Sequence, residues 1–190
     1  QNIDEDDDLV LILSGTDIDS ELLFFNASVD GNGAASVDGT TLTVTPTQDY
    51  NGEIEVTVEV SDGELTDQTS FILTVNPVND PPEISIISNQ LVNEDSSLLL
   101  NLTANDIDGD SLTYTASVDG NGTASVDGTT LTVSPDDDFN SDIGDIQVTV
   151  IVSDGELTGN TSFTLTVNPV NDAPVIDLVN NQNIDEDDDL

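Results

Sequence analysis

An internal repeat of about 90 residues is the feature that most restricts how this chain can fold. The segment ASVDGNG at 27–33 returns at 116–122, and TVNPVND at 74–80 returns at 166–172, with three extra residues near Asp142 in the second copy. A repeat of this length is too long for one turn of a solenoid. It has the size of a small domain with its own core, so we expect a row of similar domains.

The outermost segments indicate where the domains begin and end. QNIDEDDDL at 1–9 reappears unchanged at 182–190, and QLVNEDSSL at 90–98 is a divergent middle copy. We therefore expect two repeats and the start of a third, as a piece of a longer array. The predicted domains are 1–79 (first strand partly missing), 80–171, and 172–190 as the first strand of the next repeat.

Each repeat is predicted to be all-β. In 53–61, Ile54, Val56, Val58 and Val60 alternate with polar residues, which is typical of a strand with one face in a core. Asp-Gly pairs between such runs favour tight turns. In the second repeat the expected strands are 83–88, 96–104, 112–119, 123–126, 129–135, 145–153 and 161–169. Seven strands at this spacing predict tandem immunoglobulin-like (Ig-like) Greek-key sandwiches.

The charge of the chain excludes several classes of function. There are 40 Asp and Glu residues and no Lys, Arg, His or Cys, giving a net charge of -40. Such a surface cannot neutralise phosphates, so no nucleic-acid partner is expected. Zinc, iron and copper lack their usual imidazole and thiolate ligands. No apolar run reaches about 18 residues, so direct membrane insertion is not expected.

An enzyme is not expected either. The side chains needed for a Ser/His or Cys/His nucleophile or a Lys Schiff base are missing. Two carboxylates could hydrolyse a glycoside, but the two Tyr and five Phe residues offer few aromatic platforms for a sugar and are expected in the core.

Disorder is the alternative that the composition raises, because acidic chains with few aromatic residues are often unfolded. The hydrophobic share of 35% and its alternating arrangement favour a folded chain instead. Mutual repulsion of the carboxylates opposes compaction even at physiological salt, so bound counter-ions are expected.

Alternating strand directions sort the acidic loops to two ends of each repeat, a proximal end where the chain enters and a distal end where it leaves. Acids of the second repeat at its proximal end are Asp106, Asp108, Asp110 and Asp154. Candidate ligands of the first repeat at its distal end are Glu5, Asp49, Asn79 and Asp80. Tandem connection would bring these two ends together. Crowded oxygen ligands suit calcium, which takes 6–8 of them.

Neither of two common calcium-binding motifs is present. The loop that begins at Asp106 carries Ser111 where an EF-hand requires Gly, and Ser117 at its twelfth position. The glycine-rich nonapeptide of calcium-binding β-helices is absent too. Asp30, Asp38, Asp119 and Asp127 are interpreted as turn formers, and within the run 4–8 Glu5 is taken as the one ligand.

The ordered set of an N-terminal Glu, a D-x-D loop, an Asp-Gly loop and a V-N-D-x-P linker resembles the cadherin repeat, and more closely the bacterial cadherin-like repeats of large surface proteins. The resemblance spans both repeats and implies calcium at the domain junctions. The residues that match the family's ligand positions are Glu5, Glu94, Asp17, Asp19, Asp106, Asp108, Asp62, Asp154, Asn79, Asp80, Asn171 and Asp172. Animal cadherins carry Asp-Arg-Glu in a further loop, where this chain offers Asp49 and Asp138 instead.

The expected function is a calcium-rigidified structural repeat of a long extracellular stalk or filament, as in a secreted or cell-surface adhesin or a fibre. Its expected partners are adjacent repeats of the same chain or neighbouring chains in a fibre. The alternative is a calcium-dependent adhesive or carbohydrate-binding module with surface glycans as partners. Asn26, Asn101, Asn121 and Asn160 begin glycosylation sequons, which arise easily by chance in a chain this rich in Asn and Thr.

Overall fold

A computed structural model describes residues 1–19, 22–181, 183 and 186 of the chain. The chain forms two compact units. Unit 1 comprises Gln1–Pro82, Asn105–Leu112 and Ser153–Thr158, and unit 2 comprises Glu83–Ala104, Thr113–Val152 and Gly159–Leu190. Two loops of the second repeat therefore belong to unit 1. The domain limits drawn from the repeat stay a prediction.

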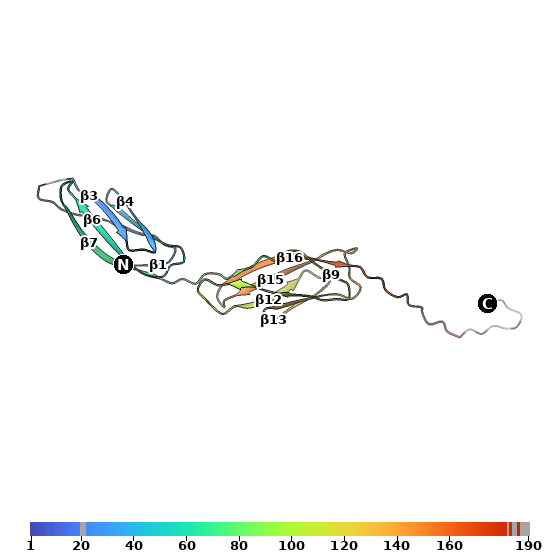
Figure 1. Ribbon diagram of the computed structural model, residues 1–190. Helices are drawn as coiled ribbons and strands as arrows, with labels where there is room; N and C mark the ends of the chain where they lie inside the picture. The colour runs from blue at the N-terminus through green and yellow to red at the C-terminus, as the bar shows by residue number, and fades with distance from the viewer. Residues whose placement is uncertain (20–21, 182, 184–185, 187–190) are drawn as a thin grey trace. The chain divides into compact units, whose positions relative to one another are not determined.

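The first repeat is a sandwich of two sheets (Figure 1). Its strands are β1 (Asn2–Asp4), β2 (Leu9–Ile12), β3 (Phe24–Val29), β4 (Gly33–Asp38), β5 (Thr41–Pro46), β6 (Gly52–Ser61) and β7 (Thr66–Asn76). One sheet has the order β1-β7-β6-β3 and the other β2-β5-β4. Leu42, Val44, Ile54 and Leu73 are fully buried between them, which is how a sandwich hides one face of each sheet.

The second repeat has the same plan with two additional two-residue strands. They are β8 (Glu83–Ile84), β9 (Gln90–Asn93), β10 (Leu98–Asn101), β11 (Ala104–Asn105), β12 (Thr113–Val118), β13 (Gly122–Asp127), β14 (Thr130–Pro135), β15 (Ile146–Ser153) and β16 (Thr158–Asn168). The sheets are β12-β15-β16-β9, β10-β14-β13 and the small pair β11-β8. No helix is assigned in the described part of the chain, and the predicted all-β sandwich fold is confirmed.

The expected alternation of buried and exposed side chains is present in β6, but it weakens towards Val60. Ile54 and Val56 are completely buried and Val58 nearly so, while Glu53 and Glu55 face solvent. Val60 continues the inward series, yet it is only half-buried. The core of the first repeat is therefore less well covered at the end of β6 than in the middle.

The first expected strand of the second repeat is divided into two. Of the predicted 83–88, only β8 is a strand, and it pairs with β11. β9, which was not expected, pairs in parallel with β16, with Gln90 opposite Leu165. β1 pairs with β7 in the same way. The pairing of β9 with β16 was missed because a four-residue strand has little periodicity of its own, and its partner lies about 75 residues away.

The strand expected within 172–190 is not assigned in the described residues 172–181, 183 and 186. Residues 182, 184–185 and 187–190 of this prediction lie outside the described residues.

The aspartates interpreted as turn formers lie in bends or directly before turns. The Glu55 N–H donates to Oδ1 of Asp30 at 3.0 Å, and the Gln147 N–H donates to Oδ1 of Asp119 at 2.9 Å. Asp38 ends β4 and pairs with Thr41 across a tight hairpin. The next residue, Gly39, has a φ of 60°, which explains the glycine there.

The register of β7 makes a direct test of the sandwich. Leu73 is fully buried, whereas its neighbour Ile72 points outward and is 44% exposed. We expect Leu73→Ala to lower the free energy of unfolding of the first repeat by about 2–5 kcal/mol, and Ile72→Ala to change it by less than about 1 kcal/mol. Urea unfolding followed by Tyr50 fluorescence in a Tyr114→Phe background measures this. Equal losses for both variants would contradict the register.

Candidate metal centre

Two buried glutamates bind the backbone of the segments that follow β7 and β16. Glu5 and Glu94 are each 4% exposed and occupy equivalent positions, just after β1 and β9. The Val78 N–H donates to Oε1 of Glu5, and the Val170 N–H donates to Oε1 of Glu94. Each glutamate therefore ties the segment that follows the last strand to the loop that follows the first.

Asn140 adds a further hydrogen bond in the second repeat. Its Nδ2 donates to Oε2 of Glu94 at 2.9 Å. This bond and the one from Val170 lower the pKa of Glu94, because both donors favour the charged carboxylate.

Three aspartates from separate segments come together beside Glu5. Asp6 follows β1, Asp49 lies between β5 and β6, and Asp80 follows β7. Their carboxylate oxygens lie within 4.8 Å of one another. Asp6 and Asp49 have φ angles of 65° and 56°, a left-handed conformation that Asp tolerates better than most residues. The turns hold these side chains in place, and the Asp49 N–H donates to Oδ1 of Asp6 at 3.3 Å.

The two loops that unit 1 takes from the second repeat meet the same segment. The Asp80 N–H donates to Oδ2 of Asp108 at 2.9 Å, and Asn79 Nδ2 donates to Oδ2 of Asp154 at 2.9 Å. Asp106 closes its own loop, since its Oδ1 accepts the N–H groups of Asp108 and Asp110, both at 3.1 Å. All seven residues predicted from these loops and the linker therefore gather in unit 1: Glu5, Asp49, Asn79, Asp80, Asp106, Asp108 and Asp154.

Hydrogen bonds satisfy some of these carboxylates. The N–H groups of Glu156 and Leu157 donate to Oδ1 of Asp154, both at 2.7 Å. Together with the Asn79 amide, whose effect is the largest, they lower the pKa of Asp154.

Two other carboxylate oxygens are left without donors. Among the residues that the structure describes, Asp80 Oδ2 and Asp106 Oδ2 are buried and have no hydrogen-bond partner. Desolvation raises the pKa of Asp80, and the negative charges of Asp49, Asp6, Asp108 and Glu5 raise it further. A buried carboxylate without a donor is costly unless a cation compensates it.

The donor set fits a hard divalent cation. It consists of carboxylate oxygens from several segments, as calcium prefers, and lacks the nitrogen and sulfur ligands of zinc. The chain has no cationic side chain, so a cation from solution is the available source of compensating charge. Asp6, Asp49 and Asp80 are the residues whose carboxylate oxygens lie close enough together to hold it.

Unit 2 repeats the same arrangement of three aspartates. The carboxylate oxygens of Asp95, Asp138 and Asp172 also lie within 4.8 Å of one another, and Asp95 and Asp138 have φ angles of 60° and 57°. Desolvation raises the pKa of Asp172, as do the charges of Asp138, Asp95 and Glu94. The predicted residues Glu94, Asp138 and Asp172 are thus close together. Asn171 precedes Asp172 and donates from Nδ2 to its carbonyl oxygen at 3.0 Å.

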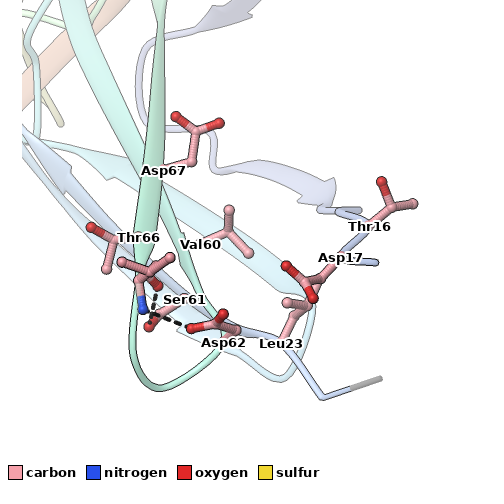
Figure 2. A pocket seen from close by; sticks show the side chains of 9 residues that line it. Thr16, Asp17, Leu23, Val60, Ser61, Asp62, Thr66 and Asp67 are labelled. Carbon is pink, nitrogen blue, oxygen red and sulfur yellow. Dashed lines mark hydrogen bonds between the residues drawn. The ribbon is translucent and has the colours of Figure 1, made fainter. Parts of the chain in front are cut away.

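Asp17, Asp19 and Asp62, the remaining predicted residues, lie at the other end of the first repeat. Asp17 and Asp62 line a pocket of about 190 Å³ and approach it from different segments, as Figure 2 shows. Asp17 accepts the Asp19 N–H at 2.8 Å, and Asp62 Oδ1 accepts the N–H groups of Glu64 and Leu65, both at 2.7 Å. These backbone donors, Leu65 first, lower the pKa of Asp62. In the described part of the chain, these residues do not join either group of three aspartates.

Asp6 and Asp95 belong to the groups of three, although sequence reasoning passed over them. One signal was present. In the divergent copy at 90–98 the Glu-Asp pair is kept as Glu94-Asp95, while Asp4, Asp7 and Asp8 of the first copy are replaced by Asn or Ser. This Asp is retained because its backbone adopts the left-handed conformation and its carboxylate belongs to the group of three.

These sandwiches and their acidic ends define a tandem Ig-like repeat protein, and comparison with known families gives the narrower class. Residues 2–76 match the family described as cadherin-like domain, and residues 79–169 match the family described as bacterial Ig domain. Each match covers one of the two repeats, which confirms the resemblance seen in the sequence. Such domains are generally non-enzymatic structural or adhesive repeats, typically extracellular or on the cell surface.

Several solved structures have a similar fold. Human protocadherin-24 EC1-2 is 16% identical, with 86% of this chain and 88% of that chain covered and a TM-score of 0.49. Drosophila N-cadherin EC1-3 is 13% identical, with 81% and 57% covered and a TM-score of 0.43. An endo-fucoidan hydrolase of glycoside hydrolase family 107 is 22% identical, with a TM-score of 0.39; the match covers 90% of this chain and 28% of the hydrolase.

No curated protein sequence matches the chain significantly. Within the described residues, no helix has the length and apolar character needed to cross a membrane.

The raised pKa of Asp80 predicts a pH effect when metal is removed. Its charged form is unfavourable in the folded state, so the folded protein loses stability as pH rises through this pKa. In chelator we expect Asp80→Asn to raise the melting temperature at neutral pH, with the gain shrinking as the pH falls and wild-type Asp80 becomes protonated. Asp127→Asn, in an exposed hairpin, is the control of equal charge. A lower melting temperature for Asp80→Asn at neutral pH would contradict the prediction.

Proposed function

We propose that this chain is a calcium-stiffened structural segment of a long extracellular stalk or filament. The observation that carries the proposal is the pair of buried, unpartnered oxygens on Asp80 and Asp106. They come from the segment after β7 and from the 105–112 loop, so one cation bound to both would connect these two segments.

A structural role also agrees with what surrounds the acidic cluster. Glu5 holds the backbone of the segment after β7, and Asn79 and Asp80 of that segment contact Asp154 and Asp108. The acidic cluster thus lies at the segment that links one repeat to the next, and Asp80 is part of that segment. A bound ion there would supply positive charge and restrict the linker, which is the property that a stalk requires. The proposed partners are adjacent repeats of the same chain or neighbouring chains in a fibre, outside the cell.

Calcium should therefore stabilise the protein. Extracellular calcium modules bind with dissociation constants of about 10⁻⁴–10⁻³ M, so saturating calcium should add on the order of 1–3 kcal/mol per site to the free energy of unfolding. We expect a higher melting temperature and a narrower distribution of dimensions in small-angle scattering with calcium than with chelator. If neither quantity changes, the proposed function is wrong.

Individual substitutions separate a defined site from general charge screening. Asp106→Asn and Asp80→Asn should each weaken calcium binding at least about tenfold in calorimetric titration, because each removes a charge from an oxygen that has no other partner. Asp127→Asn removes the same formal charge from an exposed hairpin and should have little effect. Equal effects of all three would favour diffuse screening. In calcium, Asp80→Asn should also lower the melting temperature, the reverse of its effect in chelator.

A further inference from the structure

The larger sheet of the first repeat carries an exposed aromatic side chain on its outer face. Phe24 begins β3 and is 56% exposed, although the aromatic residues were expected in the core. The other Phe residues and both Tyr residues are buried or half-buried. The counterpart of Phe24 in the second repeat, Thr113, is exposed too, even though a repeat precedes it in the chain. The exposure therefore belongs to this position of the fold.

Three polar side chains form a row beside this phenylalanine. Asn26 of β3 lies opposite Glu59 of β6, and Glu59 lies opposite Gln68 of β7, on three strands that are neighbours in the sheet (Figure 1). Neighbouring strands lie about 4.8 Å apart, so the row spans about 10 Å. Phe24 stands two residues before Asn26 in the same strand, so both point to the same face. The aromatic ring and the polar row therefore share one surface.

A shallow hollow runs along this row. It has a volume of about 100 Å³, and its lining consists of Asn26, Ala27, Ser28, Thr57, Glu59 and Gln68. Within the described part of the chain, the side chains of Asn26, Glu59 and Gln68 form no hydrogen bond with other residues. An amide offers both donors and acceptors, and a carboxylate offers acceptors. The hollow therefore presents both kinds of hydrogen-bonding group to a ligand.

The second repeat lacks this combination of side chains. The counterparts of Phe24, Asn26, Glu59 and Gln68 are, in the same order, Thr113, Thr115, Ile151 and Asn160. Other positions on the same face are unchanged between the repeats, since the counterparts of Ser28, Thr57 and Ser70 are Ser117, Thr149 and Ser162. The second repeat forms the same sheet without the aromatic ring and the carboxylate, so the fold itself does not require them.

We propose that this face of the first repeat binds a neutral glycan, with Phe24 against one face of a sugar ring and with Glu59 and the two amides bonded to its hydroxyl groups. The face of an aromatic ring is electron-rich and attracts the C–H groups that line one side of a sugar ring. Hydroxyl groups can donate to the carboxylate of Glu59, and the amides of Asn26 and Gln68 can both donate to hydroxyls and accept from them. This interaction goes beyond the calcium-dependent role proposed above and does not require calcium.

The charges of the chain narrow the class of ligand. A net charge of -40 with no basic side chain repels anionic ligands, including sulfated glycans. A divalent cation requires several carboxylates, but the hollow is lined by only one, that of Glu59. Glu55, on the same face, is outside the hollow and its Oε1 accepts from the Ser70 hydroxyl at 2.9 Å. One aromatic ring, one carboxylate and two amides match an uncharged ligand that is rich in hydroxyl groups.

A glycan array probed with the full chain, in calcium and in chelator, tests the proposal. The array carries mannan, dextran and galactan as free polysaccharides, and oligosaccharides of the same sugars attached to a carrier protein, so it separates the two sources of a neutral glycan. The chain is made in cells that attach no N-linked glycans, because Asn26 also begins a sequon. We expect binding to a neutral glycan in both conditions and none to heparin. Absence of binding to every neutral glycan, or binding in calcium alone, would overturn the proposal.

Residues of the second repeat supply variants that keep the fold. Phe24→Thr and Glu59→Ile should each weaken binding of the strongest-binding array glycan at least about tenfold in calorimetric titration, because each removes a proposed contact. Ile72→Thr is the matched control, since it also introduces the residue of the second repeat on this face but lies outside the hollow. Equal effects of the three variants would overturn the proposal. Glycan binding in a chain whose melting temperature does not respond to calcium would support this proposal while the calcium-dependent role fails, so the two ideas fail separately.

Discussion

Carboxylates without cationic partners are the constraint on which the rest of this structure depends. With 40 acids and no basic side chain, each carboxylate must face water, accept hydrogen bonds from backbone or neutral side-chain donors, or bind a cation from solution. The structure sorts them in this way. Asp62, Glu94 and Asp154 accept hydrogen bonds that lower their pKa values, while desolvation and then neighbouring like charges raise the pKa values of Asp80 and Asp172. The acids of the second kind lie in the segments that follow the sandwiches, so the unbalanced charge is concentrated where one repeat would be joined to the next.

Much of this could be predicted from the sequence, because the signals were local. The alternation in β6 and the Asp-Gly turns gave the sandwich, and the order of acidic loops placed Asp80 near Asp108 and Asn79 near Asp154. Two features were missed. The parallel pairing of β9 with β16 depends on residues about 75 positions apart. The part played by Asp6 depends on its left-handed backbone, which the run of acids from Asp4 to Asp8 does not reveal by itself; the retention of Asp95 in the divergent copy was the one signal of it.

The three inserted residues of the second repeat make its distal end different from that of the first. Next to the insertion, Asn140 donates to Glu94, and the Ser141 N–H donates to the Val167 carbonyl at 2.8 Å. Phe139, which replaces Tyr50, is 5% exposed, whereas the Tyr50 hydroxyl donates to the Glu53 carbonyl. In the second repeat the loop before β15 is thus bonded both to the buried glutamate and to the last strand. Each distal end has its own group of three aspartates, but the loop that carries the second group makes additional hydrogen bonds to the rest of its repeat.

Charged and apolar residues follow one another closely in the segments after both sandwiches. Asp172 is followed within a few residues by exposed Ile176, just as Asp80 is followed by buried Ile84. Repulsion alone would keep one repeat from approaching the next, while the apolar segment alone would bind any open sheet edge. Used together, they favour a surface that offers both apolar side chains and carboxylates able to share a cation. For the proposed partners, adjacent repeats or neighbouring chains, such a pairing would supply specificity in a chain that has no positive side chain with which to select them.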